Sequence, residues 1–90
     1  MNRIPVKNEE IVWRNLDGEA VLLNPNTGKY FGMNAVGCSF WEKIDGQNTV
    51  AEIIDYLLEE YEVTRSVLEQ DLNELIDAML KNNIISIEKQ

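Results

Sequence analysis

Short apolar runs separated by turn residues fill the first third of the chain and predict a small antiparallel sheet. Residues 11–14 and 19–24 have the β-branched and aromatic character of strands. The Asp-Gly pair between them favours a tight hairpin turn. A second turn over residues 24–28, which contains proline and glycine, returns the chain into a third strand at 29–32. We therefore expect three strands that follow one another as a meander.

The spacing of apolar residues changes after this sheet to every three or four positions, which predicts helices. The first helix spans residues 35–43. Gly37 in its interior costs stability relative to alanine, so we expect another element to pack closely there. Gly46 is suited to the left-handed position that follows a helix end.

Two further helices complete the pattern. Thr49 and Glu52 form a capping box at the start of the second, which carries the apolar residues from Ile53 to Tyr61. The third helix spans about residues 64–81 and ends at a pair of asparagines. Residues 84–87 form either a final short strand or an extended tail. The predicted fold is α+β and winged helix-turn-helix-like, with a three-stranded antiparallel sheet packed on three helices in a single domain, residues 1–90, whose ordered core covers about 11–87.

Projection of the third helix at about 100° per residue divides it into a core stripe and two shoulders. The core stripe is predicted to consist of Leu68, Leu72, Leu75, Ile76 and Met79, with Leu68, Leu75 and Met79 at its centre. One shoulder carries Ile76 and Leu80, and the other mixes apolar and acidic residues, namely Val67, Asp71, Glu74 and Ala78. If this second shoulder faces the third strand, the two form a groove with an apolar floor and an acidic rim.

The strand at 29–32 is predicted to lie at an edge, because everything after it up to residue 81 has helical periodicity. An open edge that carries two large aromatic residues favours aggregation unless an extended peptide docks there as another strand. Tyr30 and Phe31 face opposite sides of the sheet, so at most one of them belongs to the main core. The sequence leaves open which of the two faces a ligand.

The charge and hydropathy of the chain argue against several classes of function. The 90 residues carry a formal net charge of −8, with a sequence pI near 4.3. On the third helix, Arg65 and Lys81 stand against four carboxylates, so phosphate repulsion opposes DNA binding. The chain has no apolar run long enough to span a membrane and no signal-peptide core, and we expect a cytoplasmic protein.

Catalytic and metal-binding residues are scarce. The chain has one cysteine and no histidine, which excludes an internal disulfide, a Cys–His pair and histidine metal sites. The carboxylates lack the loop spacing of a calcium site. We expect no catalytic residue, no metal and no cofactor, and we interpret Cys38 as a buried, inert thiol. A redox protein that uses Cys38 is the enzyme-class alternative.

Three segments together resemble the PqqD-like family of RiPP recognition elements, which are small chaperones of precursor peptides. These segments are residues 20–34, residues 41–46 and residues 49–53. The resemblance covers about residues 12–85 and extends through Asp71 and Leu72. It implies a winged-helix-like fold that binds the leader segment of a ribosomally made precursor peptide as a strand beside the third strand and against the third helix. Carried onto this chain, the implied peptide-binding residues are Lys29, Tyr30, Phe31, Met33, Val67, Asp71, Glu74, Leu75 and Ala78.

The resemblance also implies partners. Family members present the leader to a radical SAM enzyme in cofactor synthesis, or to a leader peptidase or cyclase in lasso-peptide pathways. No catalytic segment is attached here, so we expect those enzymes to be separate chains, and the protein itself to be a monomer or weak dimer. The pathway stays open between pyrroloquinoline quinone, a lasso peptide and another modified peptide. The alternative function is an acidic winged-helix module that binds proteins in transcription.

Overall fold

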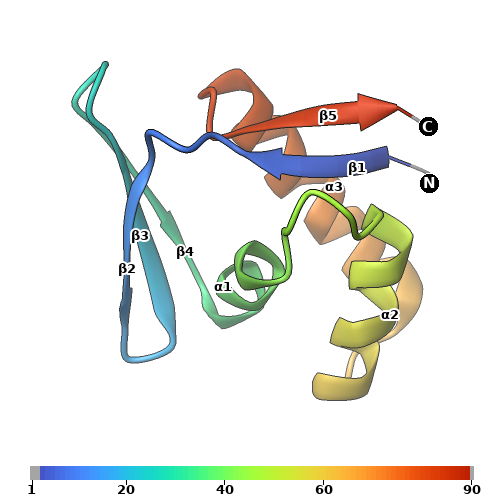
Figure 1. Ribbon diagram of the computed structural model, residues 1–90. Helices are drawn as coiled ribbons and strands as arrows, with labels where there is room; N and C mark the ends of the chain where they lie inside the picture. Colours follow the sequence, from blue (N-terminus) through green and yellow to red (C-terminus); the bar gives the residue numbers. More distant parts are fainter. Residues whose placement is uncertain (1–2, 90) are drawn as a thin grey trace.

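The computed structural model describes residues 3–89. Strands β2, β3 and β4 form a three-stranded antiparallel sheet in that order, and β1 pairs with β5 in a separate two-stranded sheet (Figure 1). The predicted α+β architecture of three helices and a three-stranded antiparallel sheet is therefore confirmed. Along the chain the elements are β1 (Arg3–Lys7), β2 (Val12–Leu16), β3 (Glu19–Asn24), β4 (Lys29–Met33), α1 (Ala35–Glu42), α2 (Val50–Glu60), α3 (Arg65–Lys81) and β5 (Ile85–Lys89).

Strand β1 is the element that the sequence pattern did not predict, and it precedes the expected core of residues 11–87. It pairs antiparallel with β5, from Arg3 opposite Lys89 to Lys7 opposite Ile85. Pro5 lies inside it, and a proline normally argues against a strand unless the strand lies at an edge. The partner of β1 is also at the far end of the chain, so no local signal identifies the pair. Of the two alternatives for the C-terminal residues, the strand is the correct one.

The hairpin turns follow the predicted chemistry. Asp17 and Gly18 both have positive φ, at 54° and 84°, as a type I′ turn requires. This turn sets the register in which Leu16 lies opposite Glu19. Gly28 has a φ of 72° in the second turn, where a side chain at Cβ would strain the backbone.

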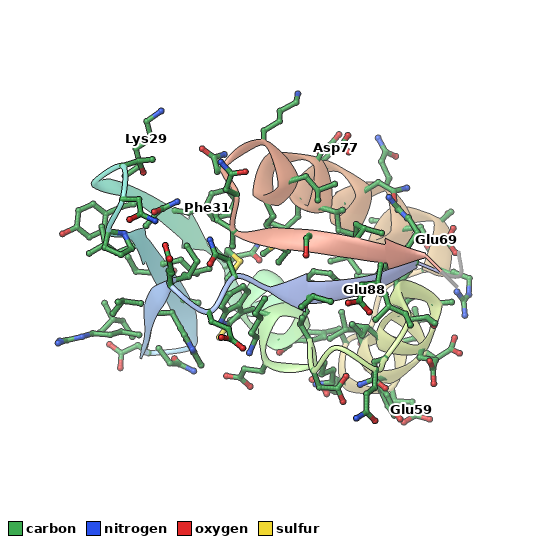
Figure 2. All side chains as sticks on the ribbon, turned by 45° about the horizontal axis from the view of Figure 1, so that its top comes forward. Lys29, Phe31, Glu59, Glu69, Asp77 and Glu88 are labelled. Carbon is green, nitrogen blue, oxygen red and sulfur yellow. The ribbon has the colours of Figure 1, made fainter. Side chains whose placement is uncertain are left out.

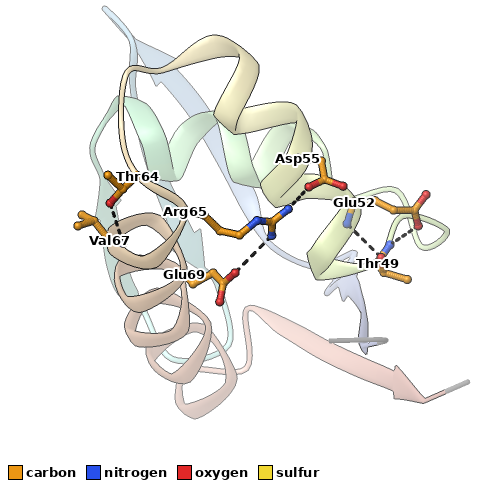
Figure 3. Close-up of polar contacts among 7 residues, drawn as sticks. All are labelled: Thr49, Glu52, Asp55, Thr64, Arg65, Val67 and Glu69. Carbon is orange, nitrogen blue, oxygen red and sulfur yellow. Dashed lines mark hydrogen bonds and ion pairs between the residues drawn. The ribbon is translucent and has the colours of Figure 1, made fainter.

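The helix ends are fixed mostly by the predicted caps. Thr49 Oγ1 accepts a hydrogen bond from the Glu52 N–H at 3.1 Å, and Glu52 Oε1 accepts one from the Thr49 N–H at 3.0 Å, which confirms the capping box (Figure 3). At the end of α3, the N–H of Ile84 reaches the carbonyl of Met79 at 2.9 Å. Asn83 supplies the left-handed residue, with φ 58°, so this is a Schellman motif.

The end of α1 differs from the prediction. The helix ends at Glu42 with Lys43 as its C-cap, so Gly46 does not occupy the position directly after the cap. Gly46 still has a positive φ of 80°, but within the loop that leads to α2. In this loop the Asp45 carboxylate accepts hydrogen bonds from the N–H groups of Gln47 and Asn48 at 2.9 and 2.8 Å. These bonds lower the pKa of Asp45.

Helix α1 occupies the centre of the molecule, between the three-stranded sheet and α2 (Figure 1). It packs on β3 and α2, while α2 contacts α3 and β1, and α3 contacts β5. Phe40 and Trp41 of α1 are buried in the common core with Leu22 of β3. Within residues 3–89, no helix combines the length and apolar character needed to cross a membrane.

Candidate functional site

Strand β4 lies at an edge of the three-stranded sheet, as the sequence predicts. Among the described residues it pairs with β3 alone, with Lys29 opposite Asn24 and Met33 opposite Ala20. Its other side therefore offers backbone N–H and C=O groups to an added strand. Lys29 and Phe31 lie on this part of the sheet, whereas Glu69 and Asp77 belong to α3 (Figure 2).

The structure decides which aromatic residue of β4 faces inward. Phe31 lies opposite Leu22, which is 1% exposed, and it packs against the core while remaining partly exposed itself. Tyr30 lies opposite Leu23 and is 72% exposed on the outer face of the sheet. Because neighbouring strand residues alternate between faces, Phe31 and Met33 share the inner face and Tyr30 does not.

The outer face is apolar around Tyr30. Residues of β2 and β3 surround it, and they enclose a shallow hollow of about 380 Å³. Val12 and Leu16 are 54% and 56% exposed there. This second surface lies on the opposite side of β4 from Phe31. Its lining residues are Val12, Trp13, Arg14, Leu16, Val21, Leu23 and Tyr30.

Helix α3 is rotated relative to the predicted projection. Ile76, expected at the shoulder side of the core stripe, is fully buried, and Leu75, expected at the centre of the stripe, is only partly buried. The buried stripe consists of Leu68, Leu72, Ile76 and Met79. The rotation places Leu75 beside the acidic shoulder rather than in the core, so it is available to a ligand.

Two hollows lie along β4, one at each end, and α3 contributes to both. The hollow at the end of the strand has a volume of about 480 Å³ and is lined by Gly32, Met33, Asn34, Val36, Gly37, Asp71, Leu72, Glu74 and Leu75. The hollow at its start has a volume of about 180 Å³ and is lined by Leu22, Asn24, Thr27, Lys29, Tyr30, Phe31, Lys81, Asn82, Asn83 and Ile84. We call the two hollows together the β4–α3 groove. Within it β4 and α3 run in opposite directions.

The β4–α3 groove brings together seven of the nine residues carried over from the family resemblance. Two others do not line either hollow. Val67 is 52% exposed in the first turn of α3, where its N–H is capped by Thr64 (Figure 3). Ala78 is partly buried. Both share a helix face with Asp71, but the groove as it stands reaches neither side chain.

The sequence reasoning missed the contribution of α1 to the groove. Asn34 caps α1 by accepting a hydrogen bond from the Gly37 N–H at 3.0 Å, and both residues line the larger hollow. A Cβ at Gly37 would lie 2.9 Å from Met33 Cβ and 3.4 Å from Leu75 Cδ2. The expected close packing at Gly37 is therefore confirmed, and it was the signal that could have located this part of the groove.

Cys38 is buried behind the sheet rather than in the groove. Its Sγ lies 3.5 Å from Glu42 Oε1 and 3.6 Å from Asn15 Nδ2. Burial raises the pKa of the thiol, and the nearby Glu42 carboxylate raises it further. The thiol is thus kept protonated and inaccessible, which is the environment of an inert cysteine.

Several other carboxylates are held in ion pairs. Arg65 joins Asp55 of α2 to Glu69 of α3 (Figure 3), and Lys43 pairs with Glu60. The part of the chain that the structure describes contains no group of three or more potential metal ligands. In contrast, Asp71 and Glu74 are exposed at the groove.

A match to a protein-family model identifies the family of this chain. The model of the family described as coenzyme PQQ synthesis protein D (PqqD) matches residues 19–85. The chain belongs to the PqqD family. The matched range contains β3, β4 and all three helices, and hence every element that lines the β4–α3 groove.

Two solved structures are similar to this PqqD family member. "TbiB1 in Complex with the TbiA(beta) Leader Peptide" has 32% sequence identity and a TM-score of 0.80, and the match covers 90% of this chain and 94% of that one. "Lasso peptide synthetase B1 complexed with the leader peptide" has 24% identity and a TM-score of 0.77, with 91% and 96% covered, and shows the common fold. No curated protein matches the chain.

Proposed function

We propose that this protein is a non-catalytic adaptor that binds the leader segment of a ribosomally made precursor peptide. The leader adds as a strand to the open side of β4 and rests its side chains on α3. The observation that carries this proposal is the unpaired edge of β4 above two hollows that α3 completes. The likeness to TbiB1, whose structure is a complex with a leader peptide, supports it.

The groove has the features that strand addition requires. Backbone pairing with β4 gives affinity without regard to sequence, and alternate side chains of the peptide enter pockets that give specificity. Phe31, Met33 and Leu75 supply an apolar floor, while Asp71 and Glu74 supply a polar rim. None of this needs a reactive side chain, and the thiol of Cys38 lies outside the groove.

The adaptor acts by positioning the precursor peptide. A leader held on β4 keeps the attached precursor near a modifying or processing enzyme on a separate chain, which raises the effective concentration of the substrate. The exposed outer face around Tyr30 stays free when the groove is filled, because it lies on the other side of the sheet. A radical SAM gene beside this one would indicate cofactor or related chemistry, and a leader-peptidase gene would indicate a lasso pathway.

The test is hydrogen exchange with a leader peptide, taken from a small precursor gene that is sought near this one. We expect the peptide to bind in calorimetry and to slow amide exchange across Lys29–Gly32. Strand β2 is the internal control, because it is the other edge of the same sheet and none of its residues lines the β4–α3 groove. Protection of β2 instead of β4, or binding that leaves both edges unprotected, would contradict strand addition in the groove.

The acidic winged-helix module gains no support from the site. A transcription module would present α3 to DNA or to a basic partner, but the exposed carboxylates Asp71, Glu74 and Asp77 oppose DNA along this helix. A gel-shift experiment at low salt checks this reasoning, and a shifted DNA band would refute it.

A further inference from the structure

The two ends of the β4–α3 groove carry opposite charges. Lys29 of β4 and Lys81 of α3 both line the hollow at the start of the strand. Asp71 and Glu74 line the hollow at its end. All four side chains are exposed. Asp77 lies one turn before Lys81 but lines neither hollow, so it does not neutralise the basic end from within the groove.

Strand β4 and helix α3 extend over similar lengths along the groove. Strand β4 advances about 14 Å from Lys29 to Met33, at about 3.4 Å per residue. Helix α3 advances about 15 Å from Asp71 to Lys81, at 1.5 Å per residue. A strand added to β4 therefore passes from one charged end to the other within about four residues. Residues four apart on a strand point to the same side, so both can face α3.

The helix dipoles oppose these charges but are weaker. The amino end of α1 at Asn34 adds about half a positive charge to the end that holds Asp71 and Glu74. The carboxyl end of α3 adds about half a negative charge beside Lys29 and Lys81. Two full side-chain charges outweigh half a charge at each end, so the polarity of the groove is set by the side chains.

We propose that the β4–α3 groove selects peptides by the order of their charges. The preferred peptide has an acidic residue that lies at Lys29 and Lys81, a basic residue about four positions away that lies at Asp71 and Glu74, and an apolar residue midway that packs on Phe31. Because a strand pairs slightly better antiparallel than parallel to β4, the backbone sets the direction of the peptide, and the charge order is recognised relative to that direction. This inference rests on the proposed function, since it assumes that a peptide binds along β4.

The experiment compares the protein with a variant of reversed polarity. The substitutions Lys29→Glu, Lys81→Glu, Asp71→Lys and Glu74→Lys exchange the two ends and leave the net charge of −8 unchanged. All four positions are exposed, and thermal unfolding verifies that the variant is folded. Both proteins are used to select strands from a displayed library of random peptides. The best peptide for each is then synthesised together with an isomer in which its acidic and basic residues are exchanged.

We expect the unmodified protein to prefer its selected peptide over the isomer by about tenfold, because two exposed ion pairs become two repulsive contacts. The variant should prefer the opposite order, and both preferences should shrink in 1 M salt, where charges are screened within about 3 Å. Peptides that bind and protect β4 equally well in either charge order would overturn this inference while leaving the proposed function intact. A library from which no peptide binds along β4 would overturn both.

Discussion

The two adjacent aromatic residues of β4 allow a sharp test of which face of the strand binds the peptide. We consider Phe31→Ala and Tyr30→Ala, which each remove one ring from neighbouring positions of the same strand. Phe31 faces the groove beside Leu22, whereas Tyr30 lies on the outer face of the sheet, where it lines the outer hollow and also borders the smaller hollow of the groove. Exposure alone would favour Tyr30 as the ligand contact, since it is 72% exposed. The geometry of the strand predicts instead that Phe31 is the main contact of the peptide.

The expected loss can be worked from the buried surface. A peptide side chain that packs on the partly exposed Phe31 ring would, counting the apolar surface of both partners, remove roughly 60–80 Å² from water, which at about 25 cal/mol per Å² is about 1.5–2 kcal/mol. Phe31→Ala should therefore raise Kd by about ten- to thirtyfold. Tyr30→Ala should raise Kd by less than Phe31→Ala does, because the Tyr30 side chain lies on the outer face of the sheet and only borders the smaller hollow of the groove.

Calorimetry with the leader peptide that binds the unmodified protein measures both affinities. Phe31 also packs against the core, so its removal lowers the free energy of unfolding, by less than the roughly 3–5 kcal/mol of a fully buried phenylalanine. Urea unfolding of each variant gives the folded fraction, by which the active concentration is corrected. Phe31→Leu, which retains apolar contact, serves as the conservative control and should restore most of the affinity. A loss of binding in Tyr30→Ala with none in Phe31→Ala would refute the assignment of faces.

Two further predictions concern groups outside the groove. Since Cys38 is buried and its thiol pKa is raised, a disulfide reagent should modify it slowly in the native protein and rapidly in urea; stoichiometric modification within seconds under native conditions would contradict the structure. The pKa of Asp45 is lowered on folding, so the ionised carboxylate stabilises the fold above its ordinary pKa near 4 and this stability is lost as the pH falls through the lower, folded pKa. Unfolding curves of Asp45→Asn should thus differ from those of the unmodified protein at pH 7 and converge in acid, and a difference that persists at pH 2 would count against the hydrogen bonds from Gln47 and Asn48.

Local signals in the sequence predicted local structure well. The turn at Asp17 and Gly18 and the capping box of Thr49 and Glu52 each depend on residues within four positions of one another. Their geometry is decided by backbone sterics and by hydrogen bonds that the rest of the fold does not change. The left-handed residue Asn83 at the end of α3 belongs to the same class.

Features that depend on distant partners were predicted less well. Strand β1 forms through β5, from the other end of the chain, and its interior proline hides it from a strand pattern. The rotation of α3 depends on which neighbours cover it. Leu68, Leu72, Leu75, Ile76 and Met79 occupy an arc wider than a single helix neighbour covers, and periodicity alone does not say which edge of that arc is left exposed. Packing against α2 and β5 buries Ile76 and leaves Leu75 beside the groove.

The position of α3 also affects how readily the open edge of β4 pairs with another sheet. A free edge normally invites another sheet to pair with it. Residues of α1 and α3 line the hollows along the inner side of β4. A strand that pairs with β4 must therefore lie beside α3. A second copy would bring its own α3 to the same place, because the sheet and that helix belong to one packed unit, so the two helices would compete for the same space. We infer that this arrangement admits an isolated extended segment more readily than another folded copy, and that the helix which supplies the floor of the groove also limits self-association through β4.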